Sequence, residues 1–192
     1  MNKKILIISG SPKNDGNTSA LVEWFCEGAK TKNADIEIVN ISSLKNASRG
    51  CTSCRLCQKL KEYECVIKDD ISPVLKKMID ADAIIMATPL YFFSASAQIK
   101  LVFDRMFSLY KWDNENNTMQ TPLKGKTFAV MTSAYEDIGL EALEKPFFLT
   151  AEYTKMAFES LLIANAGVSG DIRKNTAAKQ RAFDFGFRIA SL

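Results

Sequence analysis

Short apolar runs alternate with amphipathic stretches along most of the chain. Residues 3–9 form an apolar run that ends at small residues, which is typical of a strand buried on both faces of a sheet. Further β-rich runs cover residues 35–42, 82–89, 126–134 and 159–170. Apolar residues at helical spacing predict helices within residues 17–29, 71–79, 96–110, 139–159 and 175–190.

This alternation predicts a parallel sheet that helices cover on both faces, with right-handed crossover connections. In such folds ligands bind beyond the carboxyl ends of the strands, where the strand order reverses. Three segments follow strand ends, at residues 9–19, 88–96 and 132–139. We therefore expect these segments to build the functional site.

Two segments interrupt the regular pattern. Residues 50–66 form a cysteine-rich loop, and the polar residues 111–125 predict a loop insertion. Asp69 or Asp70 is expected to cap the helix that follows the first of these, and Pro146 is expected near a helix start or a break. Since no domain boundary is visible, residues 1–192 are predicted to form a single domain.

Composition narrows the function classes. The net charge of +3 is too small to indicate a nucleic-acid partner or a membrane surface. The chain has no histidine, which excludes Ser-His-Asp and Cys-His catalytic sites and histidine-ligated zinc. The first apolar run is shorter than a signal sequence requires, and no run approaches the length of a membrane span. We therefore expect a cytoplasmic protein whose thiols stay reduced.

The first strand is followed by the loop SGSPKNDGNTS, residues 9–19. Its glycines relax the backbone, Lys13 adds a positive charge, and the next helix is expected to begin at about Asn17 or Thr18. The free amides at that helix start favour a bound phosphate. The loop matches neither a Walker A motif nor G-x-G-x-x-G, so a polar turn with a good helix cap is the competing interpretation.

Four cysteines follow the pattern C-x2-C-x2-C-x7-C at Cys51, Cys54, Cys57 and Cys65. The first three have the spacing that holds three ligands of a [4Fe–4S] cluster in bacterial ferredoxins. Zinc usually takes two separated C-x2-C pairs, and a thioredoxin-type pair needs only two of the four cysteines. Thiols without metal, reduced or in disulfides, remain the main alternative. Cys26, on the first helix, is expected to be a small buried hydrophobe.

The segments ILIISGSPKNDGNTSAL and DAIIMATPLYFFSASAQIKLVFDR resemble the flavodoxin-like NADPH-dependent FMN reductase family. Members carry a phosphate loop of G-S-P-x(n)-N-T type and a segment P-x-Y-x(n)-S-x(n)-L-K-x(3)-D-R. The second motif corresponds here to Pro89, Tyr91, Ser96, Ile99 in place of Leu, Lys100, Asp104 and Arg105. Asp104 and Arg105 fall off the apolar stripe of their helix, so we expect them to face solvent or a neighbouring subunit.

The resemblance implies an α/β fold, a three-layer α/β/α sandwich with a five-stranded parallel sheet of order 2-1-3-4-5. It also implies an FMN site in three parts. The phosphate would be held by Ser9, Ser11, Lys13, Asn17, Thr18 and Ser19, the flavin ring lined by Pro89, Leu90, Tyr91, Phe92 and Phe93, and the third wall formed by Ser133, Ala134 and Tyr135. Core or interface aromatics are the competing interpretation for residues 91–93.

Within the same superfamily, the iron–sulfur flavoproteins carry a compact cysteine motif between the second strand and the second helix. The four cysteines of this chain lie in that place. The resemblance therefore implies an FMN-dependent oxidoreductase in which a [4Fe–4S] cluster at Cys51, Cys54, Cys57 and Cys65 exchanges single electrons with FMN. The electron source would be NAD(P)H or a ferredoxin-like carrier, and family members usually form dimers or tetramers.

Three other functions stay open from the sequence. An NAD(P)H-dependent FMN or quinone reductase would have cysteines that bind no metal. A flavodoxin-like electron carrier would have no substrate of its own, although such carriers tend to be acidic and this chain is slightly basic. A metal or redox sensor would use the cysteines without flavin. The sequence identifies neither the physiological donor nor the acceptor.

Overall fold

One parallel sheet organises the chain. The computed structural model describes residues 2–47, 49–113 and 115–192. Five parallel strands lie in the order β2-β1-β3-β7-β8. Their bounds are β1 (Lys4–Ser9), β2 (Asp35–Asn40), β3 (Ala83–Tyr91), β7 (Thr127–Ser133) and β8 (Ala157–Ile163). A short sixth strand, β4 (Ser94–Ala95), pairs antiparallel with the end of β3. The predicted order 2-1-3-4-5 of the parallel strands is confirmed.

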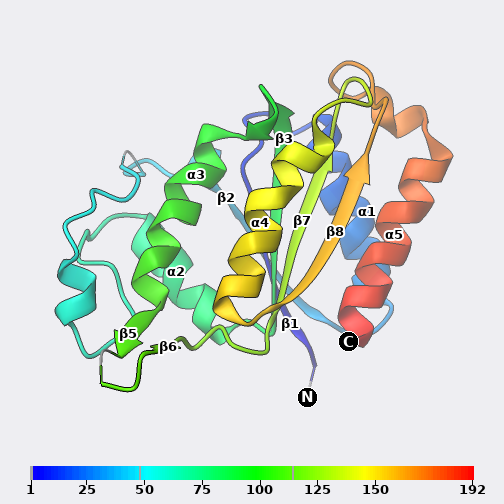
Figure 1. Cartoon of the computed structure of the whole chain (residues 1–192). Helices are drawn as coiled ribbons and strands as arrows, with labels where there is room; N and C mark the ends of the chain where they lie inside the picture. Colours follow the sequence, from blue (N-terminus) through cyan, green and yellow to red (C-terminus); the bar gives the residue numbers. More distant parts are fainter. Residues whose placement is uncertain (1, 48, 114) are drawn as a thin grey trace.

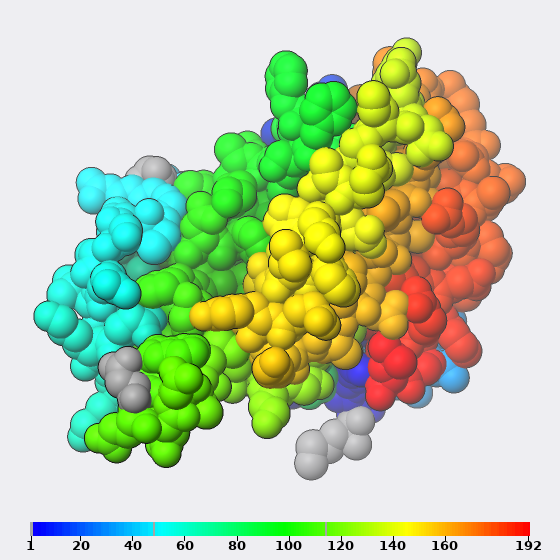
Figure 2. Space-filling model, viewed as in Figure 1, coloured from blue at the N-terminus to red at the C-terminus, as the bar shows by residue number. Residues whose placement is uncertain are grey.

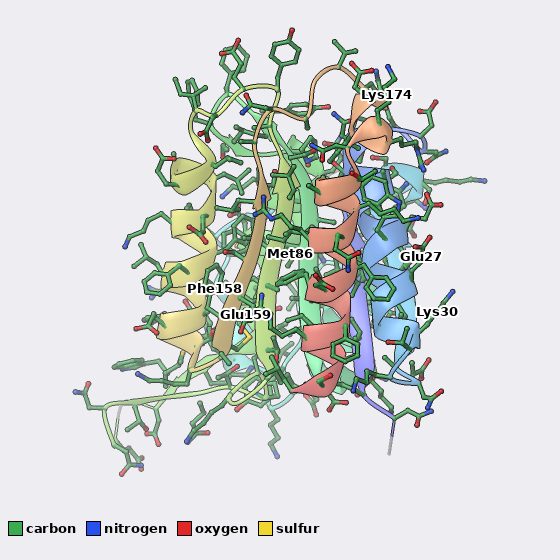
Figure 3. The ribbon with its side chains drawn as sticks, turned by 90° about the vertical axis from the view of Figure 1, so that its right-hand side faces the viewer. Glu27, Lys30, Met86, Phe158, Glu159 and Lys174 are labelled. Atoms are coloured by element: carbon green, nitrogen blue, oxygen red, sulfur yellow. The ribbon has the colours of Figure 1, made fainter. Side chains whose placement is uncertain are left out.

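Helices cover both faces of this sheet (Figure 1). One face carries α1 (Asn17–Lys30) and α5 (Thr176–Ser191), and the other carries α2 (Ile71–Asp80), α3 (Ala97–Phe103) and α4 (Leu140–Thr154). Figure 3 shows the layers from the side, with α4 on one side of the sheet and α1 and α5 on the other. The predicted three-layer sandwich is therefore confirmed.

The apolar runs in the sequence reflect burial on both faces of the sheet. Ile5 and Ile7 of β1 pack in the hydrophobic cluster beneath α1 and α5, whereas Leu6 and Ile8 pack in the cluster beneath α2, α3 and α4. Neighbouring side chains of a strand point to opposite faces, so a central strand must be apolar throughout. Among the described residues, no helix is long and apolar enough to span a membrane.

Two predicted elements end earlier than their patterns indicated. The strand predicted at 159–170 ends at Ile163, because Asn165 and Gly167 adopt positive φ angles of 53° and 68° that a strand cannot contain. The helix predicted at 139–159 ends at Thr154, where Lys155 adopts the left-handed conformation. Pro146 lies inside that helix, so the prediction that it marks a start or a break was wrong. The missing amide removes one helical bond, and burial of Leu143 and Phe147 on the same helix compensates.

Two other segments differ in detail. The helix predicted at 96–110 is α-helical only to Phe103 and then tightens into a 3₁₀ segment, η3 (Asp104–Leu109). The segment 111–125, predicted as a loop, contains a small antiparallel hairpin of β5 (Lys111–Asp113) and β6 (Thr118–Gln120). Residue 114 of that segment lies outside the described residues. The cysteine-rich loop contains one 3₁₀ turn, η2 (Leu56–Lys59), and two others are η1 (Ile41–Ser43) and η4 (Asp171–Lys174).

Candidate functional site

The carboxyl ends of β1, β3 and β7 lie side by side. Register fixes this arrangement, because Ser9 of β1 pairs with Ala87 of β3, and Pro89 of β3 pairs with Ser133 of β7. The three predicted segments therefore meet at one edge of the sheet, where the strand order reverses beside β1. We call this edge, residues 9–19, 89–96 and 133–139, the flavin edge.

The first segment ends at the start of α1, as predicted. Its N-cap is Gly16, which has no side chain to bond the first amides of the helix, and the first helical bond runs from the Ala20 amide to the Gly16 carbonyl. The amides of residues 17–19 therefore have no partner within the helix. A Cβ at Gly16 would lie 3.3 Å from Cβ of Lys13 and 3.4 Å from Oγ of Ser169, so the loop packs closely at this position. The arrangement fits a phosphate group.

Side chains of the same loop hold its shape. The Ser19 hydroxyl donates to the Lys13 carbonyl at 2.8 Å, and the Ser11 hydroxyl donates to the same carbonyl at 3.0 Å. Ser9, Ser11 and Thr18 are buried. The Asn17 amide group donates to the carbonyls of Ala166 and Gly167, both at 3.2 Å, and its oxygen accepts from the Gly170 amide at 2.7 Å. The Asn17 side chain thus binds within the protein, and only its backbone amide remains as a donor for a phosphate.

The second segment is a tight hairpin that presents aromatic side chains. Tyr91 of β3 pairs with Ser94 of β4, so Phe92 and Phe93 form a two-residue turn. Both have positive φ, 46° and 61°, which is the backbone of a type I′ turn and is strained for residues other than glycine or asparagine. Phe92 is 97% exposed. In Figure 2 this hairpin, coloured green, projects at the top of the molecule.

The hairpin and the third segment line a cavity that is open to solvent. It has a volume of about 340 Å³ and is lined by Leu90, Phe92, Phe93, Ala134, Tyr135, Glu136 and Ile138. Five of these seven were predicted to line the flavin, whereas Glu136 and Ile138 were missed. Gly139 leaves room for the Phe93 ring of the hairpin, because a Cβ there would lie 2.2 Å from Cδ1 of Phe93. The aromatic and aliphatic lining suits the face of a flavin ring.

Helix α3 fastens the phosphate loop to the hairpin. The Ser96 hydroxyl donates to the Gly10 carbonyl at 2.8 Å and accepts from the Ile99 amide at 3.4 Å. A Cβ at Gly10 would lie 2.4 Å from Cγ1 of Ile99 and 2.6 Å from Oγ of Ser96, so a larger residue cannot fit without displacing α3. Ser96 was part of the sequence motif, and its structural role is to join two parts of the flavin edge.

The four predicted metal ligands surround a second, smaller cavity. Cys51, Cys54, Cys57 and Cys65 all line one space of about 20 Å³, together with Arg55, Arg105 and Phe107 among others. Cys51 and Cys54 are exposed, Cys65 is half-buried, and Cys57 is buried. All four are free thiols, as is Cys26, which is buried in the other hydrophobic cluster as predicted. We call this space the cysteine cavity.

Long polar side chains hold the cysteine loop against the turn that follows α3. Lys111 Nζ donates to the carbonyls of Cys57 and Leu60 at 2.6 and 2.7 Å. Gln58 Nε2 donates to the carbonyls of Phe107 and Tyr110 at 3.2 and 3.0 Å. No sequence pattern marks either residue, because each bonds to a segment some fifty positions away.

Arg105 was predicted to face solvent or a neighbouring subunit, and this prediction was wrong. Its side chain is 0% exposed and pairs with Asp69 at 2.6 Å. The apolar-stripe argument assumed a continuous α-helix, but the 3₁₀ geometry from Asp104 onward rotates Arg105 inward. Asp104 does face solvent and pairs with Lys100. Asp69 also accepts from the Ile71 amide at 3.1 Å, so it serves the start of α2 as predicted.

The thiols of the cavity differ in pKa because their local environments differ. Hydrogen bonds, first from the Leu56 backbone and then from the Thr52 side chain, lower the pKa of exposed Cys54. Burial raises the pKa of Cys57. Burial, and then the neighbouring Tyr153, raise the pKa of Tyr110 to about 12, so its phenol stays neutral beside the cavity.

The donor set of the cysteine cavity fits a cluster better than a single ion. Within residues 2–47, 49–113 and 115–192, no group of three or more Cys, Asp or Glu side chains could hold a metal ion as placed. A cubane cluster spaces its thiolates farther apart than one ion does, and four cysteines supply the required donors. Since the present volume is about 20 Å³, near the room of one water, the exposed side of the loop must move outward to admit a cluster.

The fold and the flavin edge define a flavodoxin-like protein. The sequence model of the NADPH-dependent FMN reductases matches residues 3–158, and the chain belongs to that family. An FMN-dependent NADH-azoreductase from Bacillus anthracis superposes with a TM-score of 0.75 at 15% identity, over 98% of this chain and 100% of that one. An NAD(P)H:quinone oxidoreductase from Methanothermobacter marburgensis superposes with a TM-score of 0.73 at 16% identity, over 98% of each chain. These two likenesses establish the fold.

A curated relative matches about half of the chain. An iron–sulfur flavoprotein of Methanocaldococcus jannaschii is 36% identical over 102 residues, which is 53% of this chain and 51% of the relative. The chain thus spans about half the length of the curated relatives it matches first. Family membership and fold are established by these comparisons, and the predicted family resemblance is confirmed.

Proposed function

We propose that this chain is an FMN-dependent oxidoreductase that takes electrons from NAD(P)H. The observation that carries the proposal is the flavin edge, where unpaired amides at the start of α1 lie on the same sheet edge as the apolar cavity at residues 90–93 and 134–138. When bound there, FMN supplies the redox chemistry, accepting a hydride or two single electrons. The family and the names of the two structural neighbours support this activity.

The protein residues hold and orient the cofactor in this proposal. Gly16 caps α1 without a side chain of its own, and the amides of residues 17–19 receive the phosphate. Pro89 and Leu90 place the end of β3 against the flavin ring. Phe93 and Tyr135 exclude water from the face of that ring. Ser133 and Ala134 close the third wall. No side chain needs to act as an acid or base, which agrees with a chain that has no histidine.

We also propose that the four cysteines hold a [4Fe–4S] cluster that exchanges electrons with FMN. The placement of all four thiols around one cavity supports this, as does the name of the relative from Methanocaldococcus jannaschii. The second candidate is an NAD(P)H-dependent FMN or quinone reductase whose cysteines bind no metal. The small volume of the cysteine cavity favours that alternative.

The exposed aromatic hairpin supports assembly of the chain with a second copy. Tyr91, Phe92 and Phe93 are 49%, 97% and 51% exposed, which is unusual for three consecutive large aromatics. A neighbouring subunit that covers them would also close the flavin edge from outside. Sedimentation velocity of the FMN-loaded protein, compared with a Phe92→Ser variant, tests this: a homodimer or homotetramer that dissociates in the variant is expected.

The test of the main proposal is purification of the chain without oxygen, followed by an absorption spectrum and iron and sulfide analysis. Flavin bands with about four irons per chain are expected. A Cys57→Ala variant should lose the iron and keep the flavin, whereas a Cys26→Ala variant, altered outside the cavity, should keep both. Flavin without iron in the wild type would support the second candidate. A chain that binds no FMN even when FMN is added would overturn the proposal.

Turnover is the second half of the test. The FMN-loaded protein is mixed with NADH or NADPH and a quinone or dye acceptor, and nucleotide oxidation is followed at saturating acceptor. Steady oxidation over many turnovers is expected. Reduction of the bound flavin only by a ferredoxin-like carrier, with neither nucleotide oxidised, would contradict NAD(P)H as the donor and favour the electron-carrier function.

A further inference from the structure

Arg105 is the buried cation of the cysteine cavity. It lines the cavity wall with Phe107 and Ser108 of the same turn, facing the four cysteines. Its side chain is 0% exposed, so the guanidinium is removed from water. A charge in that position requires partners for all of its donors.

The donors of this guanidinium divide into two groups. Nη1 bonds both carboxylate oxygens of Asp69, at 2.8 and 2.6 Å. Nη2 bonds the Ile67 carbonyl at 2.9 Å and the Ser72 hydroxyl at 3.4 Å. An arginine also carries an Nε–H, and in the described part of the chain this donor is buried without a hydrogen-bond partner. The two Nη groups hold the wall of the cavity, and Nε is left over.

The chemistry of the cavity identifies the missing acceptor. A neutral thiol is a weak acceptor, whereas a thiolate or a bound sulfide accepts a charge-assisted hydrogen bond from an arginine. Among the described residues, the cavity is lined by four cysteines, by the hydroxyls of Thr52 and Ser108, and by no carboxylate. Of these side-chain acceptors, only the cysteine sulfurs can become anionic. An anionic sulfur centre would therefore satisfy the donor that the protein leaves unpaired.

We propose that Arg105 Nε donates a hydrogen bond to a sulfur of the iron–sulfur cluster held in the cysteine cavity. This inference rests on the proposed cluster. A hydrogen bond to cluster sulfur stabilises the more negative, reduced state and raises the reduction potential. Arg105 also ties the cavity to the flavin edge, because η3 continues from α3, whose Ser96 bonds the phosphate loop.

The first test compares two variants after anaerobic cluster reconstitution. Arg105→Lys keeps the positive charge, removes Nε and replaces both Nη groups by one ammonium, whereas Ser72→Ala removes one Nη2 partner and leaves Nε in place. Midpoint potentials are measured by redox titration with electron paramagnetic resonance. We expect Arg105→Lys to shift to a more negative potential and Ser72→Ala to match the wild type. Equal potentials for Arg105→Lys and the wild type, at equal iron content, would overturn the inference.

The second test uses the intact side chain, so it does not depend on the Arg105 variant folding. The chain is labelled with ¹⁵N-arginine in an Arg55→Lys background, because Arg55 also lines the cavity. Pulsed electron paramagnetic resonance of the reduced cluster should detect hyperfine coupling to an arginine nitrogen. An absent coupling in a fully loaded sample would overturn the inference and leave the proposed cluster intact. A wild-type chain that takes up no iron would overturn both.

Discussion

The flavin edge and the cysteine cavity are held together in different ways. At the flavin edge, main-chain pairing of β1, β3 and β7 fixes where each segment begins, as in the register of Ser9 with Ala87 and of Pro89 with Ser133. Close contacts then place the loops, as where Gly10 meets α3. Side-chain hydrogen bonds, such as those of Ser19 and Ser96, then fix the shape of loops that the strands have already placed.

At the cysteine cavity, hydrogen bonds from long side chains hold distant segments together, as strand pairing does at the flavin edge. Arg105, Lys111 and Gln58 each reach a carbonyl or carboxylate of a distant segment. The loop between β2 and α2 contains only 3₁₀ turns among its described residues. Substitutions that add atoms should therefore destabilise the flavin edge. Substitutions that remove a charge should destabilise the cysteine cavity.

The largest effect is expected at the buried ion pair. Arg105→Met leaves Asp69, whose side chain is 12% exposed, without its cation. Breaking one side of a buried pair lowers the free energy of unfolding by about 3–5 kcal/mol. Urea denaturation of the metal-free protein measures this. The control is Lys100→Met, which removes an exposed pair with Asp104 on the same helical segment and should change stability by about 1 kcal/mol or less. Similar losses in the two variants would show that Arg105 does not anchor the loop.

The next effect is steric and belongs to the flavin edge. Gly10→Ala places a Cβ 2.4 Å from Ile99 and 2.6 Å from Ser96, so α3 must shift away from the phosphate loop. We expect about 1–3 kcal/mol of destabilisation and an FMN affinity about tenfold weaker, equivalent to about 1.4 kcal/mol. Flavin fluorescence titration measures the affinity. Gly50→Ala is the matched control, since a Cβ there meets nothing within 4 Å. Unchanged FMN binding in Gly10→Ala would refute the role assigned to this contact.

A smaller, local effect is expected when Lys111 is replaced. Lys111→Met removes both hydrogen bonds to the carbonyls of Cys57 and Leu60, which leaves two acceptors to find water instead. The local opening free energy should fall by about 1–3 kcal/mol. Amide hydrogen exchange in residues 56–60 should quicken about tenfold or more, while amides of β1 and β3 keep their rates. Lys124→Met, on an exposed lysine, serves as the control. Uniform quickening across the sheet would mean that the two regions are not held independently.

The smallest effect is a gain in stability. In the single chain Phe92 is exposed and has a φ of 46°, so Phe92→Gly relieves backbone strain without losing area buried within the subunit. The comparison is made at concentrations where the proposed assembly is dissociated. The free energy of unfolding should rise by about 1 kcal/mol. Phe92→Ala removes the same ring and keeps the strain, so it should show no gain. Thermal unfolding compares the two variants. If the ring also serves the flavin site, both variants should lose NAD(P)H oxidation equally, and a loss in only one would exclude that role.

Local pattern was sufficient for much of the fold and for the flavin edge. Both depend on signals that lie within short segments of sequence. These signals are apolar runs for strands buried on two faces, and a glycine-containing turn before a helix. Parallel pairing then forces the ends of these strands to one edge, so residues 9–19, 88–96 and 132–139 could be placed together from the sequence alone. The individual flavin-binding residues within them were implied by the family resemblance. Where local pattern failed, at Pro146 and at residues 164–170, burial or a left-handed residue outweighed it.

The cysteine cavity shows the other case. The spacing of the four cysteines indicated candidate ligands, but not the side chains that hold their loop, because Arg105, Lys111 and Gln58 act across 33 to 54 positions of sequence. Arg105 was misplaced for a physical reason: a change from 3.6 to about three residues per turn rotates a side chain from solvent into the core, and no periodic pattern records that change. Its buried charge is stable only where Asp69, Ile67 and Ser72 converge on it, and that convergence exists only in the folded chain.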